Sequence, residues 1–306
     1  MIKRQILIFS ALLVMQNVIA QSQPGKRYKD IVFNDILIEK DLSYNSQASK
    51  DQKKSYLFDL YQPKGDDASS RPLIIWMHGG GFKFGTKTAK GVKLWSKAFA
   101  LRGYVCASIN YRLSKGNPLF HFDDLLKASF YATQDAKLAV AYFRKNAARY
   151  RIDPDKIILG GNSAGGFIAL DAAYSNNEDF GRVANLLEGE VKHSGLPHQP
   201  IYAVINYWGG IYALGWLSNA KTPIISVHGS EDGLVPITHK NSSLYGSLDI
   251  HNKADALHIP NTLKIYQGYS HELQKHFNPF FEGSKVQSRW LEAAQFTADY
   301  LYEIMK

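Results

Sequence analysis

The 306-residue chain is 45% hydrophobic and 21% charged, a globular balance that excludes collagen-like and intrinsically disordered classes. Its length suits one large domain or two modest ones. The single cysteine, Cys106, excludes intrachain disulfides and thiolate metal clusters. The formal net charge is +9, but the basic residues are scattered and accompany no nucleic-acid motif. We therefore expect a solvated basic surface and no nucleic-acid partner.

The first twenty residues have the layout of a secretory signal peptide. Lys3 and Arg4 precede an apolar run over residues 6–15, and Val18 and Ala20 stand before a predicted cleavage at Gln21. Ten strongly apolar residues are too few for a membrane span, which needs about 20. We expect residues 1–20 to be a leader and residues 21–306 to form one domain. The mature protein would then be exported, periplasmic or extracellular, with no membrane association.

In chain order, two predicted strands come first, over residues 31–38 and 56–61. Short apolar runs then alternate with segments of helical length. The runs cover residues 73–77, 104–109, 156–159, 201–207, 223–227 and 262–266, and the helical segments cover 89–102, 125–150, 164–174 and 288–304. This alternation predicts an α/β fold with a mostly parallel central sheet, helices on both faces and an antiparallel edge formed by the first two strands. Only fifteen residues separate 207 from 223, too few for a large cap domain.

A serine flanked by glycines follows the predicted strand over 156–159. In the segment Gly161-Asn162-Ser163-Ala164-Gly165, the glycines remove side chains that would collide in a sharp strand-to-helix turn. Such a turn exposes the Ser163 hydroxyl beside a helix N-terminus, whose N–H groups favour developing negative charge. The pattern therefore predicts a nucleophile.

Three consecutive glycines follow the strand over 73–77, in the segment His78-Gly79-Gly80-Gly81-Phe82. Backbone of this kind can approach a substrate closely and present N–H groups to an oxyanion. The glycines have neither the Gly-Lys-Ser/Thr ending of a phosphate-binding P-loop nor dinucleotide-binding spacing. A flexible glycine-rich loop is the alternative interpretation.

Together, HGGGF and GxSAGG resemble the α/β-hydrolase fold, in its carboxylesterase and hormone-sensitive-lipase-like branches. The stretch Asp59–Pro63 and the acid motif described below look most like secreted feruloyl and acetyl (xylan) esterases. The resemblance implies that the oxyanion donors are the N–H groups of Gly80, Gly81 and Ala164. Asn162 is a departure, because the hormone-sensitive-lipase-like branch usually has aspartate before the nucleophile.

The resemblance also implies the order nucleophile, acid, histidine. The segment His228–Pro236 resembles the family's HGxxDxxVP pattern and makes Asp232 the acid, with Glu231 as the alternative. The segment 267–272 resembles a G-x-x-H ending and makes His271 the base, with His276 as the alternative. The predicted triad is thus Ser163, Asp232 and His271. His78 and His228 are interpreted as loop supports.

Three aromatic residues, Trp208, Tyr212 and Trp216, follow the strand over 201–207 at helical spacing. Trp208 and Tyr212 are our candidates for substrate binding by stacking, with packing in the core as the alternative.

The resemblance implies a secreted serine carboxylic-ester hydrolase that forms an acyl-enzyme. Its expected substrates are small-molecule or polysaccharide-linked esters, short-chain or carrying acetyl or feruloyl groups, and no metal or cofactor is expected. One alternative is a prolyl-oligopeptidase-like serine peptidase, which shares the D-x-x-V-P motif. The other is a non-catalytic hydrolase-fold binding protein. The oligomeric state is not indicated.

Overall fold

The computed structural model describes residues 25–239, 242–279 and 283–306; the predicted leader, residues 1–20, lies outside them. Eight strands form one sheet in the order β1-β2-β4-β3-β5-β6-β7-β8. The strands are β1 (Ile36–Ser43), β2 (Leu57–Pro63), β3 (Arg71–Met77), β4 (Val105–Ile109), β5 (Ile152–Asn162), β6 (Ala203–Tyr207), β7 (Ile224–Gly229) and β8 (Asn261–Tyr266). β2 pairs antiparallel with both β1 and β4, and the remaining pairs are parallel.

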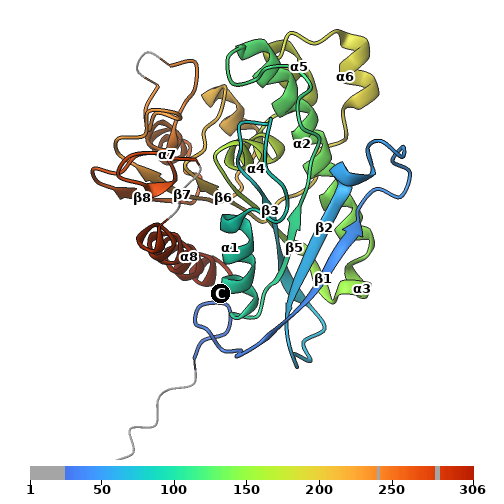
Figure 1. Cartoon of the computed structure of the whole chain (residues 1–306), viewed down its shortest axis with the longest axis vertical. Helices are drawn as coiled ribbons and strands as arrows, with labels where there is room; N and C mark the ends of the chain where they lie inside the picture. The colour runs from blue at the N-terminus through green and yellow to red at the C-terminus, as the bar shows by residue number, and fades with distance from the viewer. Residues whose placement is uncertain (1–24, 240–241, 280–282) are drawn as a thin grey trace, which may run out of the picture.

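Helices cover both faces of this sheet (Figure 1). On one face, α1 (Lys90–Ala100) packs against α8 (Ser284–Ile304). On the other, α2 (Phe122–Lys145) packs against α4 (Ala164–Tyr174). The shorter helices are α3 (Ala147–Tyr150), α5 (Asn177–Val183), α6 (Glu188–Ser194) and α7 (Ser247–Ala256), with 3₁₀ turns at Lys53–Tyr56, Leu214–Asn219 and His271–Leu273.

Strand β3 shows how the sequence builds two cores. Leu73, Ile75 and Met77 face the apolar cluster under α2 and α4. The intervening Ile74 and Trp76 face the cluster under α1 and α8. All five are fully buried, as expected for a parallel strand covered on both faces. The predicted α/β architecture, with a mostly parallel sheet and an antiparallel edge, is confirmed.

Some boundaries differ from the prediction. The first strand begins at residue 36 instead of 31, because the N–H groups of Tyr28, Val32 and Phe33 donate to the carbonyls of the two residues that follow α1. The helix predicted over 125–150 is interrupted at Asn146, and its second part ends at Arg151 in a left-handed conformation with φ of 51°. Helices α5, α6 and α7 were not predicted; they are short segments of seven to ten residues.

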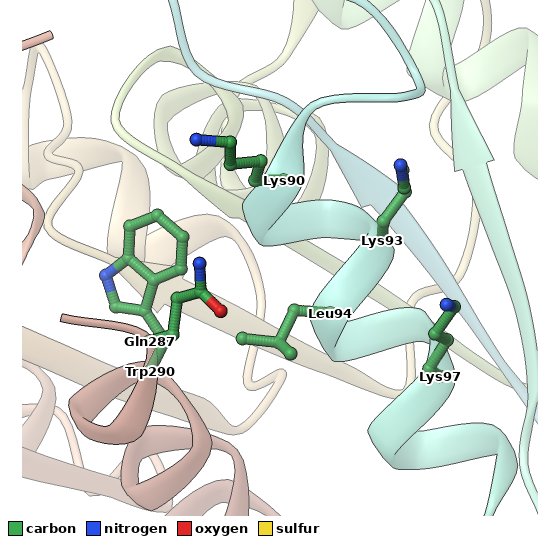
Figure 2. Close-up of a pocket in the computed structure, with 6 residues that line it drawn as sticks. All are labelled: Lys90, Lys93, Leu94, Lys97, Gln287 and Trp290. Carbon is green, nitrogen blue, oxygen red and sulfur yellow. The ribbon is translucent and has the colours of Figure 1, made fainter. Parts of the chain in front are cut away.

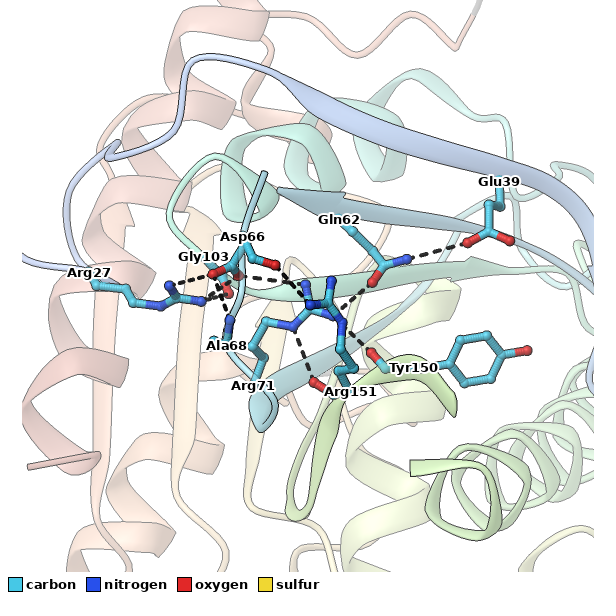
Figure 3. A network of polar contacts seen from close by, with 9 residues as sticks. All are labelled: Arg27, Glu39, Gln62, Asp66, Ala68, Arg71, Gly103, Tyr150 and Arg151. Carbon is cyan, nitrogen blue, oxygen red and sulfur yellow. Dashed lines mark hydrogen bonds and ion pairs between the residues drawn. The ribbon is translucent and has the colours of Figure 1, made fainter. Parts of the chain in front are cut away.

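A partly buried polar network joins the N-terminal segment to the sheet (Figure 3). Arg27 makes a two-point ion pair with Asp66, at 2.9 and 2.6 Å. The fully buried Arg71 donates to the side chain of Gln62 and to the carbonyls of Tyr150 and Arg151. Two-point arginine–carboxylate contacts are geometrically specific, so this network holds the end of the sheet opposite the glycine-flanked serine.

Among the described residues, no helix combines the length and the apolar character that a membrane span requires.

Candidate active site

Ser163 lies at the turn between β5 and α4 with a φ of 52°, a left-handed backbone that is uncommon for a residue with a side chain. Two glycines permit the turn. A Cβ on Gly161 would lie 2.4 Å from the carbonyl carbon of Gly165, and one on Gly165 would lie 2.1 Å from the carbonyl oxygen of Met77. The Ser163 N–H donates to the Tyr207 carbonyl at 2.9 Å. The turn is therefore tightly determined and tied to β6.

The structure brings the three predicted triad residues together. His271 Nε2 lies 3.0 Å from Ser163 Oγ, and His271 Nδ1 lies 2.7 Å from Asp232 Oδ2. Ser163, Asp232 and His271 follow β5, β7 and β8, so they meet at the carboxyl edge of the parallel strands, where such sheets bind ligands. His271 and Asp232 make these hydrogen bonds, and the alternatives Glu231 and His276 do not.

Asp232 is buried and held by four groups. Its Oδ1 accepts hydrogen bonds from the backbone N–H groups of Leu234 at 2.9 Å and Val235 at 3.0 Å. Burial opposes ionisation, but hydrogen bonds and charge from His228 and His271 outweigh it and hold the pKa of the Asp232 carboxyl well below its usual range. Asp232 is thus an anion that orients the ring of His271.

The glycine loop predicted to donate to an oxyanion lies beside the serine. Gly80 and Gly81 have φ values of 116° and 57°, and a Cβ on Gly79 would lie 3.3 Å from the Cβ of Ser163. The N–H of Gly79 donates to Asn162 Oδ1 at 3.1 Å. Asn162 therefore links this loop to the serine turn. The sequence marked Asn162 only as a departure from a family pattern and did not predict this contact.

Ala164, the third predicted donor, is the first residue of α4 and is buried. Its position directly after Ser163 places its N–H at the amino end of that helix, where N–H groups lack intrahelical partners.

His78 supports the glycine loop from inside. Its ring is buried and stacks on Tyr111 with centroids 4.3 Å apart, and its Nδ1 lies 2.7 Å from the Gly79 carbonyl. Burial lowers the pKa of His78 to about 4, so the ring is neutral at pH 7. The Tyr111 hydroxyl donates to the His78 carbonyl at 2.8 Å. His78 therefore acts as the loop support that we predicted.

An apolar rim that the sequence did not reveal lies next to the glycine loop. A Cβ on Gly81 would lie 2.4 Å from Leu119 Cδ2. Leu119 and Phe122 are 51% and 42% exposed. The Phe122 and Tyr212 rings pack edge to face, with their centroids 6.4 Å apart. Lys83 holds the segment that carries them by donating to the carbonyls of residues 114, 115 and 116. No motif marks this contact between residues about forty apart in the chain.

The prediction that Trp208, Tyr212 and Trp216 share one helical face is wrong. Trp208 lies in an irregular segment with a φ of 41°, and the 3₁₀ turn begins only at Leu214. Trp208 is fully buried among Trp95 and Trp290, whereas Tyr212 is 7% exposed and packs on Phe167 under the opposite face. Both are therefore core residues, and Trp208 has no exposed surface for substrate stacking.

A surface hollow of about 170 Å³ lies between α1 and α8 and contains none of the predicted site residues. Figure 2 shows Lys90, Lys93 and Lys97 along α1, with Gln287 and Trp290 on α8. Trp290 also donates from its Nε1 to the Glu272 carbonyl at 2.8 Å, so α8 supports the segment that carries His271.

The described residues contain no group of three or more acidic, histidine or cysteine side chains that could hold a metal ion.

Known esterases share part of this sequence. Esterase-5C of Drosophila miranda is 33% identical over 125 residues, which cover 41% of this chain and 22% of that protein. The carboxylic ester hydrolase LipM of Mycobacterium tuberculosis, described as probable, is 28% identical over 155 residues, 51% of this chain and 32% of that protein. The chain thus matches about a fifth to a third of the length of these curated relatives.

Solved structures share the fold over nearly the whole described chain. Thermogutta terrifontis esterase 2, phosphorylated by paraoxon, has a TM-score of 0.60 at 20% identity, covering 88% of this chain and 94% of that one. A truncated carbohydrate esterase from gut microbiota has a TM-score of 0.56 at 18% identity, covering 89% and 99%. The α/β hydrolase MGS-M1 from a deep-sea metagenome has a TM-score of 0.54 at 19% identity, covering 85% and 98%.

A family model also matches the sequence. The BD-FAE model matches residues 58–219, more than half of the chain, from β2 through the serine turn to the end of the Leu214–Asn219 turn. The esterase resemblance stated from the HGGGF and GxSAGG motifs is confirmed. The chain belongs to the BD-FAE family and has the α/β-hydrolase fold.

Proposed function

We propose that the protein is a serine carboxylic-ester hydrolase that works through an acyl-enzyme. The observation that carries this proposal is the continuous chain of hydrogen bonds from Ser163 Oγ through His271 to Asp232, next to a glycine loop. A nucleophile, a base and a group that orients the base are the components that acyl transfer requires.

In this mechanism Ser163 Oγ attacks the ester carbonyl carbon while its proton passes to His271 Nε2. The N–H groups of Gly80, Gly81 and Ala164 stabilise the oxyanion of the tetrahedral intermediate. The intermediate collapses, the alkoxide leaves with the proton from His271, and Ser163 remains acylated. Water then attacks the acyl group with His271 as base, releasing the carboxylic acid and regenerating the Ser163 hydroxyl.

We further propose that the substrates are short-chain esters or acetyl and feruloyl esters on carbohydrate. The apolar rim of Leu119 and Phe122 favours a compact acyl or aryl group beside the glycine loop. The connection from β6 to β7 has only a 3₁₀ turn, which favours a site accessible to bulky alcohols. The likeness to a carbohydrate esterase from gut microbiota supports the same class.

The proposal is tested by initial hydrolysis of 4-nitrophenyl acetate. The wild-type chain should turn over, and Ser163→Ala should fall to the background rate while keeping the circular dichroism and unfolding midpoint of the wild type. Ser43→Ala, which removes a hydroxyl on the exposed edge strand β1, serves as the matched control and should retain wild-type turnover. A folded Ser163→Ala that retains turnover would refute the proposal.

We also propose that residues 1–20 direct export and are removed before Gln21. Expression in a bacterial host with a secretory pathway, followed by intact-mass measurement of the exported protein, tests this. A mass that retains the first twenty residues would contradict it.

A further inference from the structure

A second histidine touches the acid of the triad. His228 is fully buried at the end of β7, four residues before Asp232. Its Nε2 lies 2.8 Å from the Val235 carbonyl oxygen and 3.4 Å from Asp232 Oδ2. That Oδ2 is the oxygen that accepts from His271 Nδ1 at 2.7 Å. Two imidazole rings therefore converge on one carboxylate oxygen.

The neighbouring hydrogen bonds determine which nitrogen of His228 carries the proton. Asn206 Oδ1 accepts from the N–H of Gly209 at 3.0 Å, so its Nδ2 faces Ser247 Oγ at 3.1 Å as a donor. The Ser247 hydroxyl is then free to donate to His228 Nδ1 at 2.7 Å. The Val235 carbonyl can only accept, so His228 Nε2 carries the hydrogen. The Nε2–H of His228 is thus held between the Val235 carbonyl oxygen and Asp232 Oδ2.

We propose that His228 is a positioning residue for ester hydrolysis, whose Nε2–H shares Asp232 Oδ2 with His271 and thereby moderates the basicity of His271. Through the Val235 carbonyl, the same N–H fixes the acid loop, defined as residues 230–236. The inference rests on the proposed function, and it adds a residue that acts on the base through the acid.

The charge balance explains the direction of the effect. The groups that face His271 are Asp232 from the acid loop, Ser163 from the serine turn and the apolar Phe277 ring at 5.1 Å. Those that face His228 are Asp232 and neutral Ser247. Asp232 is the carboxylate shared by both rings. If the His228 N–H is removed, more of the carboxylate charge acts on His271, its imidazolium is stabilised, and its pKa rises.

The test is an NMR titration of the downfield His271 Nδ1–H resonance, which requires no turnover. In His228→Leu, which removes both nitrogens, we expect the resonance to persist and the pKa of His271 to rise by roughly half a unit to one unit. In His228→Gln, whose amide retains a donor near the Nε2 position, we expect the pKa to return toward the wild-type value. In active protein, the acid limb of the kcat/KM profile should shift by the same amount.

Two serines supply a matched pair if His228→Leu does not fold. Ser247 and Ser226 are both buried and both face Asn206 Nδ2, at 3.1 and 3.3 Å, but only Ser247 contacts His228. We expect Ser247→Ala to raise the pKa of His271 and Ser226→Ala to leave it unchanged.

Three outcomes would overturn the inference. An unchanged pKa in His228→Leu, or in Ser247→Ala where the leucine variant does not fold, would mean that the ring does not act on His271. A fall in that pKa would mean that His228 only holds the loop. Equal shifts in the two serine variants would mean that any buried hydroxyl has the same effect. Failure of the esterase proposal is distinguishable, because the wild-type chain would then hydrolyse no ester while the titration pattern persisted.

Discussion

The contact between Asn162 and the glycine loop provides the sharpest test of how the site is assembled. Asn162 is 8% exposed, and its Oδ1 is the acceptor for the Gly79 N–H at 3.1 Å. Asn162→Ala removes this acceptor and leaves a backbone donor unpaired next to the predicted oxyanion loop. A buried donor without a partner costs about 1–3 kcal/mol, and loss of a whole oxyanion donor costs about 2.7–4 kcal/mol.

We take the about 1–3 kcal/mol of the lost loop hydrogen bond as the loss of transition-state stabilisation. Because about 1.36 kcal/mol corresponds to a factor of ten, we expect kcat on 4-nitrophenyl acetate to fall by roughly five- to 150-fold. KM should change little, because the oxyanion contacts form in the transition state. Asn162→Asp retains an acceptor at the same position and is the matched control, with kcat at pH 8 within about threefold of wild type. The reasoning is refuted if Asn162→Ala stays within twofold of wild type, or if both variants lose the same activity.

The remaining predictions concern stability, glycine packing and the apolar rim. Burial lowers the pKa of His78 to about 4, below the unfolded value of about 6.5, so stability should fall as pH drops from 6.5 to 4. The expected loss in the free energy of unfolding over this pH range is about 3 kcal/mol. Urea unfolding of the wild type at several pH values should show this dependence, and an equal pH dependence in His78→Gln would contradict the role given to His78. Gly165→Ala places Cβ 2.1 Å from a backbone oxygen and should lower the free energy of unfolding by about 3 kcal/mol or more. The control Gly215→Ala has open space around its Cβ and should lower it by less than about 1 kcal/mol. Similar unfolding midpoints for the two variants would contradict this explanation of the glycine packing. Leu119→Ala should lower kcat/KM for 4-nitrophenyl butyrate relative to acetate by about threefold to tenfold, and the exposed control Leu187→Ala should not; an unchanged ratio in Leu119→Ala would exclude Leu119 from the acyl site.

The sequence was informative where a structural requirement is local. The boundaries of α4 were predicted as observed, because the glycine-flanked turn marks its start and the helix is apolar apart from Asp171. The grouping of Ser163, Asp232 and His271 was predicted from the resemblance of their motifs to those of the α/β-hydrolase family. The structure agrees, because each residue follows a strand and the carboxyl ends of parallel strands meet at one edge.

Features that depend on contacts distant in sequence could not be predicted. The helical spacing of Trp208 and Tyr212 suggested one face, but the left-handed backbone at Trp208 sends the two rings to opposite sides of the sheet. The contact of Leu119 with Gly81 and the hydrogen bond from Gly79 to Asn162 join segments about forty and eighty residues apart. Helices α5 and α6 are too short to show a periodic pattern.

The central claim is that Ser163 is the nucleophile, and covalent labelling tests it most directly. We would treat the protein with paraoxon, the reagent that phosphorylates Thermogutta terrifontis esterase 2, and measure intact and peptide masses. The account predicts one diethyl phosphoryl group per chain, on the peptide that contains Ser163, with no adduct in Ser163→Ala and much slower labelling in folded His271→Gln. Labelling of a different residue, or equal labelling of folded wild type and Ser163→Ala, would contradict it.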